Sequence, residues 1–267
     1  ICLSIEEMGL QPEHSHHESG PGQNEVCFRY APAVKSADNL NTFKSAVKAI
    51  AARNGLYASF MPKPLHDQSG NGLHVNMSLM RDGKNLFESP LTPDSEAGHF
   101  VAGILAHARE LTAFCNPVPN SYARLGANEA PLYISWSRQN RSQLVRLPSA
   151  SGDLCRVELR GPDPAGNPYL VIGLILAAGL DGIARKLPLA EPVNRNLFHP
   201  SAAVGLESLP RSLREAITVA AQSDFIAAEL PLALQNKYFE YQTQLCHGYE
   251  NAPDPAVWER THGFLVI

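Results

Sequence analysis

The ten residues from Cys155 to Pro164, Cys-Arg-Val-Glu-Leu-Arg-Gly-Pro-Asp-Pro, constrain the fold more than any other stretch. Charged and apolar residues alternate at its start, and successive side chains of a strand point to opposite faces. The pattern therefore predicts a strand that carries Arg156, Glu158 and Arg160 on one face. The two prolines that follow must end the strand, because proline cannot donate a hydrogen bond to a neighbouring strand.

The cations around this strand are unevenly distributed. From Asn85 to Arg185 the chain has no lysine but eight arginines, and six of them lie between Asn116 and Arg160. Arginine binds phosphate and carboxylate with two parallel hydrogen bonds, which lysine cannot do. The bias indicates an anion-binding surface; an exposed strand with a salt-bridged outer face is the alternative interpretation.

A second polar segment, Pro12 to Glu18, contains three histidines and precedes the turn formed by residues 19–22. A strand is predicted for residues 23–30. Two strands around this turn would bring Glu18 and Glu25 close together, and carboxylates with histidine suit a hard or borderline divalent metal. Polar surface residues around a loop are the alternative.

A third segment runs from Ser69 to Leu79 and begins with Gly70-Asn71-Gly72, where the backbone can approach a ligand closely. The strand expected after it would carry His74, Asn76 and Ser78 on one face. A histidine on a strand is often structural, but this polar stripe behind a glycine-rich turn favours a binding site.

Helical spacing, caps and terminating glycines predict the remaining elements. Antiparallel strands with helices to one side indicate the α+β class. A long irregular loop spans residues 116–131. The predicted helices cover residues 1–9, 36–54, 94–112, 167–186, 212–222, 229–248 and 254–261, and further strands cover 56–61, 132–136 and 142–147.

Charge and apolar runs exclude several classes of partner. The formal net charge of −4 argues against nucleic acid or an anionic membrane as the main partner. The longest apolar run, residues 169–180, is too short to span a bilayer and predicts a buried helix. Five scattered cysteines without a CxxC motif indicate free thiols in the cytoplasm. The chain opens at Ile1 without an initiator methionine, and we expect it to be a fragment.

Common nucleotide and hydrolase motifs are missing. The sequence has no GxxxxGK[ST] and no GxSxG, and Gly70-Asn71-Gly72 lacks the third glycine of a dinucleotide-binding motif. Carboxylates, a histidine and several arginines remain. That set suits phosphoryl transfer, in which metals and arginines neutralise charge.

Seven motifs together resemble one family, the glutamine synthetases of type I, bacterial-like kind. The resemblance covers about residues 10–185 and identifies the C-terminal catalytic domain, without the N-terminal domain of that family. The motifs are HHE at 16–18 with GQNE at 22–25, FMPKP at 60–64, GNGLHVNMSL at 70–79, NSYARL at 120–125, EAP at 129–131, NRS at 140–142 and RVELRGPDP at 156–164.

The resemblance implies a role for each matching residue. Metal ligands would be Glu18 and Glu25 for one ion, and His74 and Glu158 for another. Glutamate would be bound by Gly70, His74, Arg124 and Arg160. ATP would be bound by Arg141, Arg146 and Arg156, with Ser78 and Tyr30 near the nucleotide. The catalytic residues would be Glu129, Arg141 and Arg160, with Glu129 shielding the intermediate and helping to deprotonate ammonium.

The resemblance also implies the reaction and the architecture. ATP would phosphorylate glutamate, and ammonia would displace the phosphate, with Mg²⁺ or Mn²⁺ at two or more sites. A curved antiparallel sheet would form an open, barrel-like funnel, and subunits would assemble into rings. The chain would be one catalytic domain, with the sheet and its helices in residues 1–190 and a mainly helical part in residues 191–267.

Some features depart from the family pattern. Further metal-binding glutamates come from a Glu-x-Glu strand upstream of the matching region, so we expect this chain alone to be inactive and to bind metal weakly. The loop from Arg124 to Glu129 is about one residue shorter than usual. Phe198 stands where some bacterial members carry a regulatory tyrosine, so that control is not expected.

Two other functions stay open on sequence grounds. A γ-glutamyl ligase of the same fold could use an amine or polyamine in place of ammonia. A non-catalytic binding or assembly module is the other alternative, although the matching positions for metal and substrate are all retained.

Overall fold

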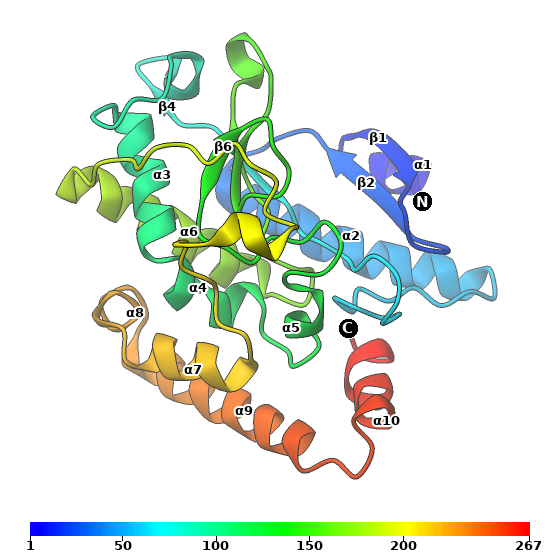
Figure 1. The fold of residues 1–267 in the computed structure, drawn as a ribbon. Helices are drawn as coiled ribbons and strands as arrows, with labels where there is room; N and C mark the ends of the chain where they lie inside the picture. The colour runs from blue at the N-terminus through cyan, green and yellow to red at the C-terminus, as the bar shows by residue number, and fades with distance from the viewer.

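The computed structural model describes residues 1–267, apart from the side chain of Pro200. A four-stranded sheet lies at the centre, with helices around it (Figure 1). Its strand order is β3-β8-β7-β6, where β3 is Val75–Met77, β8 is Val157–Leu159, β7 is Val145–Leu147 and β6 is Trp136–Arg138. The mixture of helices and small sheets agrees with the predicted α+β class.

The sheet differs from the predicted one in two respects. β3 and β8 pair antiparallel, as do β8 and β7, but β7 and β6 are parallel. No closed barrel forms among the strands of the described chain, and the predicted curved funnel is not confirmed. The parallel pair is possible because the chain crosses over between residues 138 and 145 instead of turning directly back.

The predicted strand of the RVELR motif is present, but its charged face is not a surface. In β8, Glu158 lies opposite Asn76 of β3 and Arg146 of β7. Neighbouring strands on both sides therefore leave Glu158 and Arg160 only 4 % exposed each. The alternative interpretation, an exposed strand with a salt-bridged outer face, is wrong. The apolar face packs into the main core as expected, with Val157 fully buried.

Helices α3 (Glu96–Ala106), α4 (Ala108–Cys115) and α6 (Pro168–Arg185) form the core beneath the sheet. We predicted one helix over residues 94–112, but the structure breaks it at His107. The His107 ring contacts Glu110 on one side and bonds Asp181 of α6 at 2.8 Å on the other. These contacts favour a bend at this residue.

Helix α6 confirms the helix predicted over residues 167–186, and it extends beyond the apolar run of residues 169–180 at both ends. Its 18 residues and mean hydropathy of 1.5 are enough, by length and composition alone, to cross a membrane. In this structure α6 lies against α3 as a core helix: a Cβ on Gly103 or on Gly182 would overlap the backbone of the opposite helix. Such close approach requires glycine at both positions.

The N-terminal part contains α1 (Cys2–Glu7), the antiparallel strands β1 (Pro12–His17) and β2 (Asn24–Phe28), and α2 (Ala33–Arg53). The base of the β1–β2 hairpin packs on a small apolar cluster that includes Ile5 and Leu10. Helix α2 begins at Ala33, three residues before the predicted start at Ser36, and the Ser36 hydroxyl donates to the Ala31 carbonyl.

Short elements fill the connections between these layers. The predicted strand at residues 56–61 is not formed in the described chain, and the long loop 116–131 contains one helical turn. Of the strand predicted at residues 132–136, only Trp136 lies in β6, which continues to Arg138 instead. The strand predicted at 142–147 shortens to β7. The short elements are β4 (Met80–Arg81), β5 (Lys84–Asn85), η1 (Leu86–Glu88), α5 (Ser121–Arg124), η2 (Gly152–Leu154) and η3 (Pro200–Ala203).

The C-terminal part is helical: α7 (Leu213–Ala221), α8 (Asp224–Glu229), α9 (Leu232–Glu250), α10 (Pro255–Glu259) and the π-helical turn η4 (Arg260–Phe264). Helices α7 and α9 lie beneath the core, and the chain then returns towards the site (Figure 1). The Asn120 amide donates to Glu259 at 3.0 Å, and the Phe60 amide donates to the Ile267 carbonyl.

Candidate functional site

The β1–β2 hairpin brings together the first set of candidate metal ligands. Register places His16 opposite Glu25, and the turn returns Glu18 to the same side. Ligand atoms of His16, Glu18 and Glu25 lie within 4.8 Å of one another. The expected approach of the two glutamates is confirmed. His16 was not among our predicted ligands, although its alternation with Glu18 along one strand face could have identified it.

Hydrogen bonds favour the charged form of the Glu18 carboxylate. Desolvation raises the pKa of Glu18, but bonds from the His16 ring at 3.0 Å and from the Ser19 amide outweigh it, so that the pKa lies below its usual value. The Cys27 thiol donates to Glu25 at 3.0 Å. Burial and the adjacent Glu25 raise the pKa of that thiol to about 12, which keeps it a donor.

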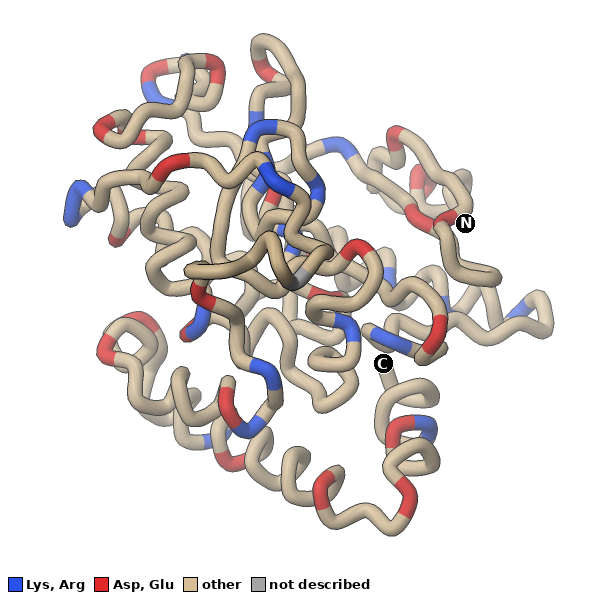
Figure 2. The backbone as a smooth tube through the Cα atoms, in the orientation of Figure 1, with Lys and Arg blue, Asp and Glu red and all other residues tan. Residues whose placement is uncertain are grey.

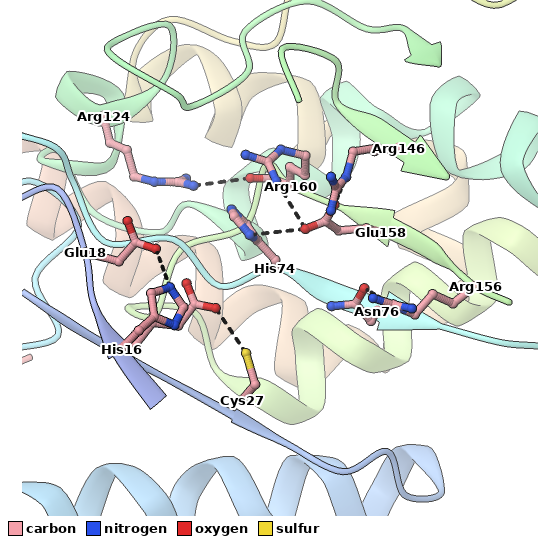
Figure 3. Close-up of polar contacts among 11 residues, drawn as sticks. His16, Glu18, Cys27, His74, Asn76, Arg124, Arg146, Arg156, Glu158 and Arg160 are labelled. Atoms are coloured by element: carbon pink, nitrogen blue, oxygen red, sulfur yellow. Dashed lines mark hydrogen bonds and ion pairs between the residues drawn. The ribbon is translucent and has the colours of Figure 1, made fainter. Parts of the chain in front are cut away.

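Glu158 is the centre of the second group (Figure 3). It accepts from Arg146 Nε at 2.5 Å and from Arg160 Nη1 at 3.1 Å, and His74 Nδ1 lies 3.3 Å away. Desolvation works against the charged carboxylate, but His74 and the two guanidinium groups prevail and lower its pKa to about 2. Glu158 is therefore a buried carboxylate at neutral pH.

The glycine-rich loop before β3 lets His74 approach Arg124. A Cβ on Gly72 would lie 2.8 Å from Arg124 Nη2 and 3.0 Å from His74 Nε2, and a Cβ on Gly70 would overlap the Pro62 carbonyl. About 32 % of the His74 side chain is exposed. Desolvation by the surrounding protein, with help from the nearby arginines, lowers its pKa despite Glu158. Neutral imidazole is the form that binds metal.

Two buried arginines line this part of the site. Arg124 donates to the Gly161 carbonyl at 2.7 Å and to the Arg160 carbonyl at 3.2 Å, and burial lowers its pKa to about 10. Arg160 bonds Glu158 through Nη1, while its buried Nε has no hydrogen-bond partner in the described chain. A buried cationic donor without a partner is costly, and an anion bonded to it would remove that cost.

Other predicted residues lie less directly at this centre. Glu129 and Arg141 are exposed but close enough to affect the pKa of Arg160, Glu129 raising it and Arg141 lowering it. Arg156 bonds Asn76 Oδ1 at 3.0 Å, and no dashed contact joins it to Glu158 (Figure 3).

The two residues predicted near the nucleotide form no hydrogen bond within the described chain. Ser78 is exposed just beyond the end of β3. Tyr30 is 67 % exposed, with the Arg29 guanidinium 6.0 Å from its ring centroid. Their predicted role therefore has no support from contacts within the chain.

The distribution of charged residues agrees with a localised site. Lys and Arg positions gather around the central sheet, and Asp and Glu positions of the hairpin lie to one side of them (Figure 2). Elsewhere the two signs are scattered. An anion bound between these groups would meet arginines from the sheet and, if a divalent metal is present, the cation held by the hairpin.

The donor set fits a divalent metal at the hairpin. One histidine and two carboxylates, all at least partly exposed, are ligands that Mg²⁺ or Mn²⁺ can use. The pair His74 and Glu158 fits less completely, because both Glu158 oxygens already accept from arginine. Among the described residues, the hairpin group is the one cluster of three or more such ligands within reach of a single ion.

A comparison with protein families decides which proteins this chain is related to. The family model "Glutamine synthetase, catalytic domain" matches residues 1–261. The chain belongs to the glutamine synthetase family. The match confirms the resemblance stated from the sequence motifs and extends it from about residue 185 into the C-terminal helices.

Curated relatives agree with this membership. The chain is 50 % identical over 238 residues to a glutamine synthetase of Methanosarcina mazei, covering 86 % of this chain and 53 % of the relative. It is 46 % identical over 246 residues to a glutamine synthetase of Staphylococcus aureus, covering 89 % of this chain and 55 % of the relative. The chain thus spans about half the length of these relatives.

Solved structures show the same fold. A structure named "GmaS/ADP complex-Conformation 1" has a TM-score of 0.87 and 35 % identity, covering 98 % of this chain and 61 % of the other. Another, "Apo GmaS without ligand", has a TM-score of 0.86 and 36 % identity, covering 97 % of this chain and 60 % of the other. The glutamine synthetase fold therefore extends over nearly the whole chain.

Proposed function

We propose that the protein carrying this chain joins ammonia to L-glutamate at the expense of ATP, through γ-glutamyl phosphate. One observation carries the proposal beyond family membership. Arg160 is buried at the centre of the site, and its Nε lacks a hydrogen-bond partner in the described chain. A carboxylate of the substrate would supply that partner, and Arg124 and Gly70 would form the adjoining wall.

The chain's carboxylates and histidines would hold the metals. His16, Glu18 and Glu25 would bind one divalent ion, and His74 with Glu158 would contribute to a second. Bound Mg²⁺ or Mn²⁺ supplies charge neutralisation for the phosphates. In the metal-free chain, hydrogen bonds from Arg146 and Arg160 fix the orientation of the Glu158 carboxylate.

Arginines on the sheet would bind the ATP phosphates and the transferring group. Arg146 lies next to Glu158, and Arg141 is near enough to lower the pKa of Arg160. Arg156, Ser78 and Tyr30 would lie along the nucleotide. One of the structural neighbours is a complex with ADP, which supports nucleotide binding by this fold.

The chemistry requires two nucleophilic attacks in sequence. A side-chain carboxylate oxygen of glutamate attacks the γ-phosphorus of ATP, and the bond to ADP breaks; the arginines offset the repulsion between these anions. Ammonia then attacks the acyl carbon, and phosphate leaves. Glu129, in the loop 124–129, would accept a proton from ammonium and help to exclude water from the acyl phosphate.

Three further features belong to the proposal. We treat residues 1–267 as one catalytic domain, which is supported by a main core shared by the sheet helices and the C-terminal residues Leu209, Ala216 and Ile226. Ring-shaped self-association is expected from the family. Location in the cytoplasm is supported by five free cysteines.

Glutamine formation from glutamate, ATP and ammonia tests the proposal, with the full-length protein and this chain assayed side by side. We expect turnover by the full-length protein and none by the chain alone. Methylamine and a diamine in place of ammonia test the amine-ligase alternative, and faster turnover with either would replace our assignment. The absence of ADP formation and of nucleotide binding by calorimetry in the full-length protein would indicate a non-catalytic module instead.

A further inference from the structure

One side chain joins the hairpin to the glycine-rich loop. Gln23 lies in the turn between β1 and β2 and forms three hydrogen bonds. Its Oε1 accepts from the amide of buried Gly20 at 3.0 Å, and its Nε2 donates to the Gly70 carbonyl at 3.0 Å and to Asn71 Oδ1 at 2.8 Å. Both ends of the side-chain amide are therefore bonded, the oxygen to the turn and the nitrogen to the glycine-rich loop.

The partner loop is itself held in place. The Asn71 side chain donates to the Met61 carbonyl at 2.8 Å, and the Asn71 backbone amide donates to the Pro62 carbonyl at 2.7 Å. Gly70 packs so closely on Pro62 that a Cβ would not fit. Gln23 therefore attaches the turn to a fixed part of the molecule.

In the described chain, no other residue of the hairpin forms a hydrogen bond to the rest of the molecule. Within the described chain, the hydrogen bonds from residues 12–28 to any other segment all come from Gln23. Apolar packing by Val26 and Phe28 anchors the opposite end, near α1 and α2. The end that carries Glu18 and Glu25 thus depends on Gln23 for its position.

We propose that Gln23 is a positioning residue that fixes the hairpin metal cluster against the loop bearing Gly70 and His74. The two halves of the site come from different sheets, so their separation is not set by any shared strand pairing. Loss of the Gln23 bonds would leave each half intact and free the distance between them. The kinetic consequence rests on the proposed function; the structural one does not.

Hydrogen exchange of the full-length protein tests the structural part. In Gln23→Ala we expect amides in residues 18–25 and 69–76 to exchange at least about tenfold faster than in the wild type, because one hydrogen bond is lost in the first segment and two in the second. Asn24→Ala is the matched control, because Asn24 is exposed and its amide bonds only the Gly22 carbonyl within the turn. Unchanged exchange in residues 69–76 would overturn the proposal.

Gln23→Glu separates the two ends of the amide and serves if Gln23→Ala does not fold. A glutamate keeps the acceptor for Gly20 and loses both donors to the loop. Residues 69–76 should then exchange faster while Gly20 stays protected. Equal protection of the loop in this variant and the wild type would refute the assignment.

Kinetics of the full-length protein test the consequence for the reaction. If it makes glutamine, Gln23→Ala should raise the KM for glutamate about tenfold, by the same lost bond, and Asn24→Ala should not. Binding of Mn²⁺ to the hairpin cluster should change less than threefold, because all three ligands remain. A wild type without glutamine formation would refute the proposed function but leave the exchange result to decide the role of Gln23. Equal KM values in an active protein would contradict the positioning role.

Discussion

The charge of Glu158 should stabilise the metal-free chain substantially. Its carboxylate is 4 % exposed and lies between Arg146 and Arg160, each within hydrogen-bond distance. Glu158→Gln keeps the shape and an acceptor but removes the charge. Buried Arg160 and partly buried Arg146 then both lose this counter-ion, which is among the more costly changes in a protein interior.

The pKa gives the size of the effect. Folding lowers the Glu158 pKa from 4.5 to about 2. A difference of this size corresponds to roughly 3 kcal/mol of unfolding free energy at pH 7. Because the folded pKa is the lower one, the contribution is complete above pH 4.5 and is lost as the pH falls towards 2. The gap between wild type and variant should therefore close over that range.

Urea unfolding of the 267-residue chain in EDTA at pH 7, and again at lower pH, measures this difference. Glu96→Gln is the control, because Glu96 pairs with Arg81, whose side chain is 62 % exposed. Exposed pairs contribute about 0–1 kcal/mol. A loss for Glu158→Gln no larger than that of Glu96→Gln would refute the reasoning, as would a gap that does not shrink on acidification.

Three further outcomes are expected. Glu25→Ala should weaken Mn²⁺ binding to the full-length protein, measured by electron paramagnetic resonance, by at least about tenfold, and unchanged affinity would exclude it as a ligand. Gly179→Ala should lower the unfolding free energy by about 1–3 kcal/mol, because its Cβ would overlap the Phe100 ring. Gly173→Ala has open space around its Cβ and should raise the unfolding free energy by about 0.5–1 kcal/mol. Equal effects of the two variants would contradict the packing. Gly72→Ala, whose Cβ would press on an arginine and a histidine, should raise the KM for glutamate in the full-length protein, with Gly173→Ala unchanged.

Local patterns predicted the elements that depend on local chemistry. Period-two alternation identified β8, and the approach of Glu18 to Glu25 also followed from neighbouring residues. The break at His107 did not, because it depends on contact with a residue of a helix far along the chain.

Partners from other strands decided the remaining features. The parallel pairing of β6 with β7 cannot be predicted from the sequence of either strand alone. The burial of Glu158 arises from strands on both sides. The surroundings of these residues therefore could not be predicted from their own segments of the sequence.

Oxygen transfer tests the central claim most directly. The full-length protein is given ATP, ammonia and glutamate labelled with ¹⁸O in its side-chain carboxylate, and the phosphate released is analysed by mass spectrometry. A γ-glutamyl phosphate intermediate predicts one ¹⁸O atom in the phosphate for each glutamine formed. Glutamine accompanied by unlabelled phosphate would contradict the account.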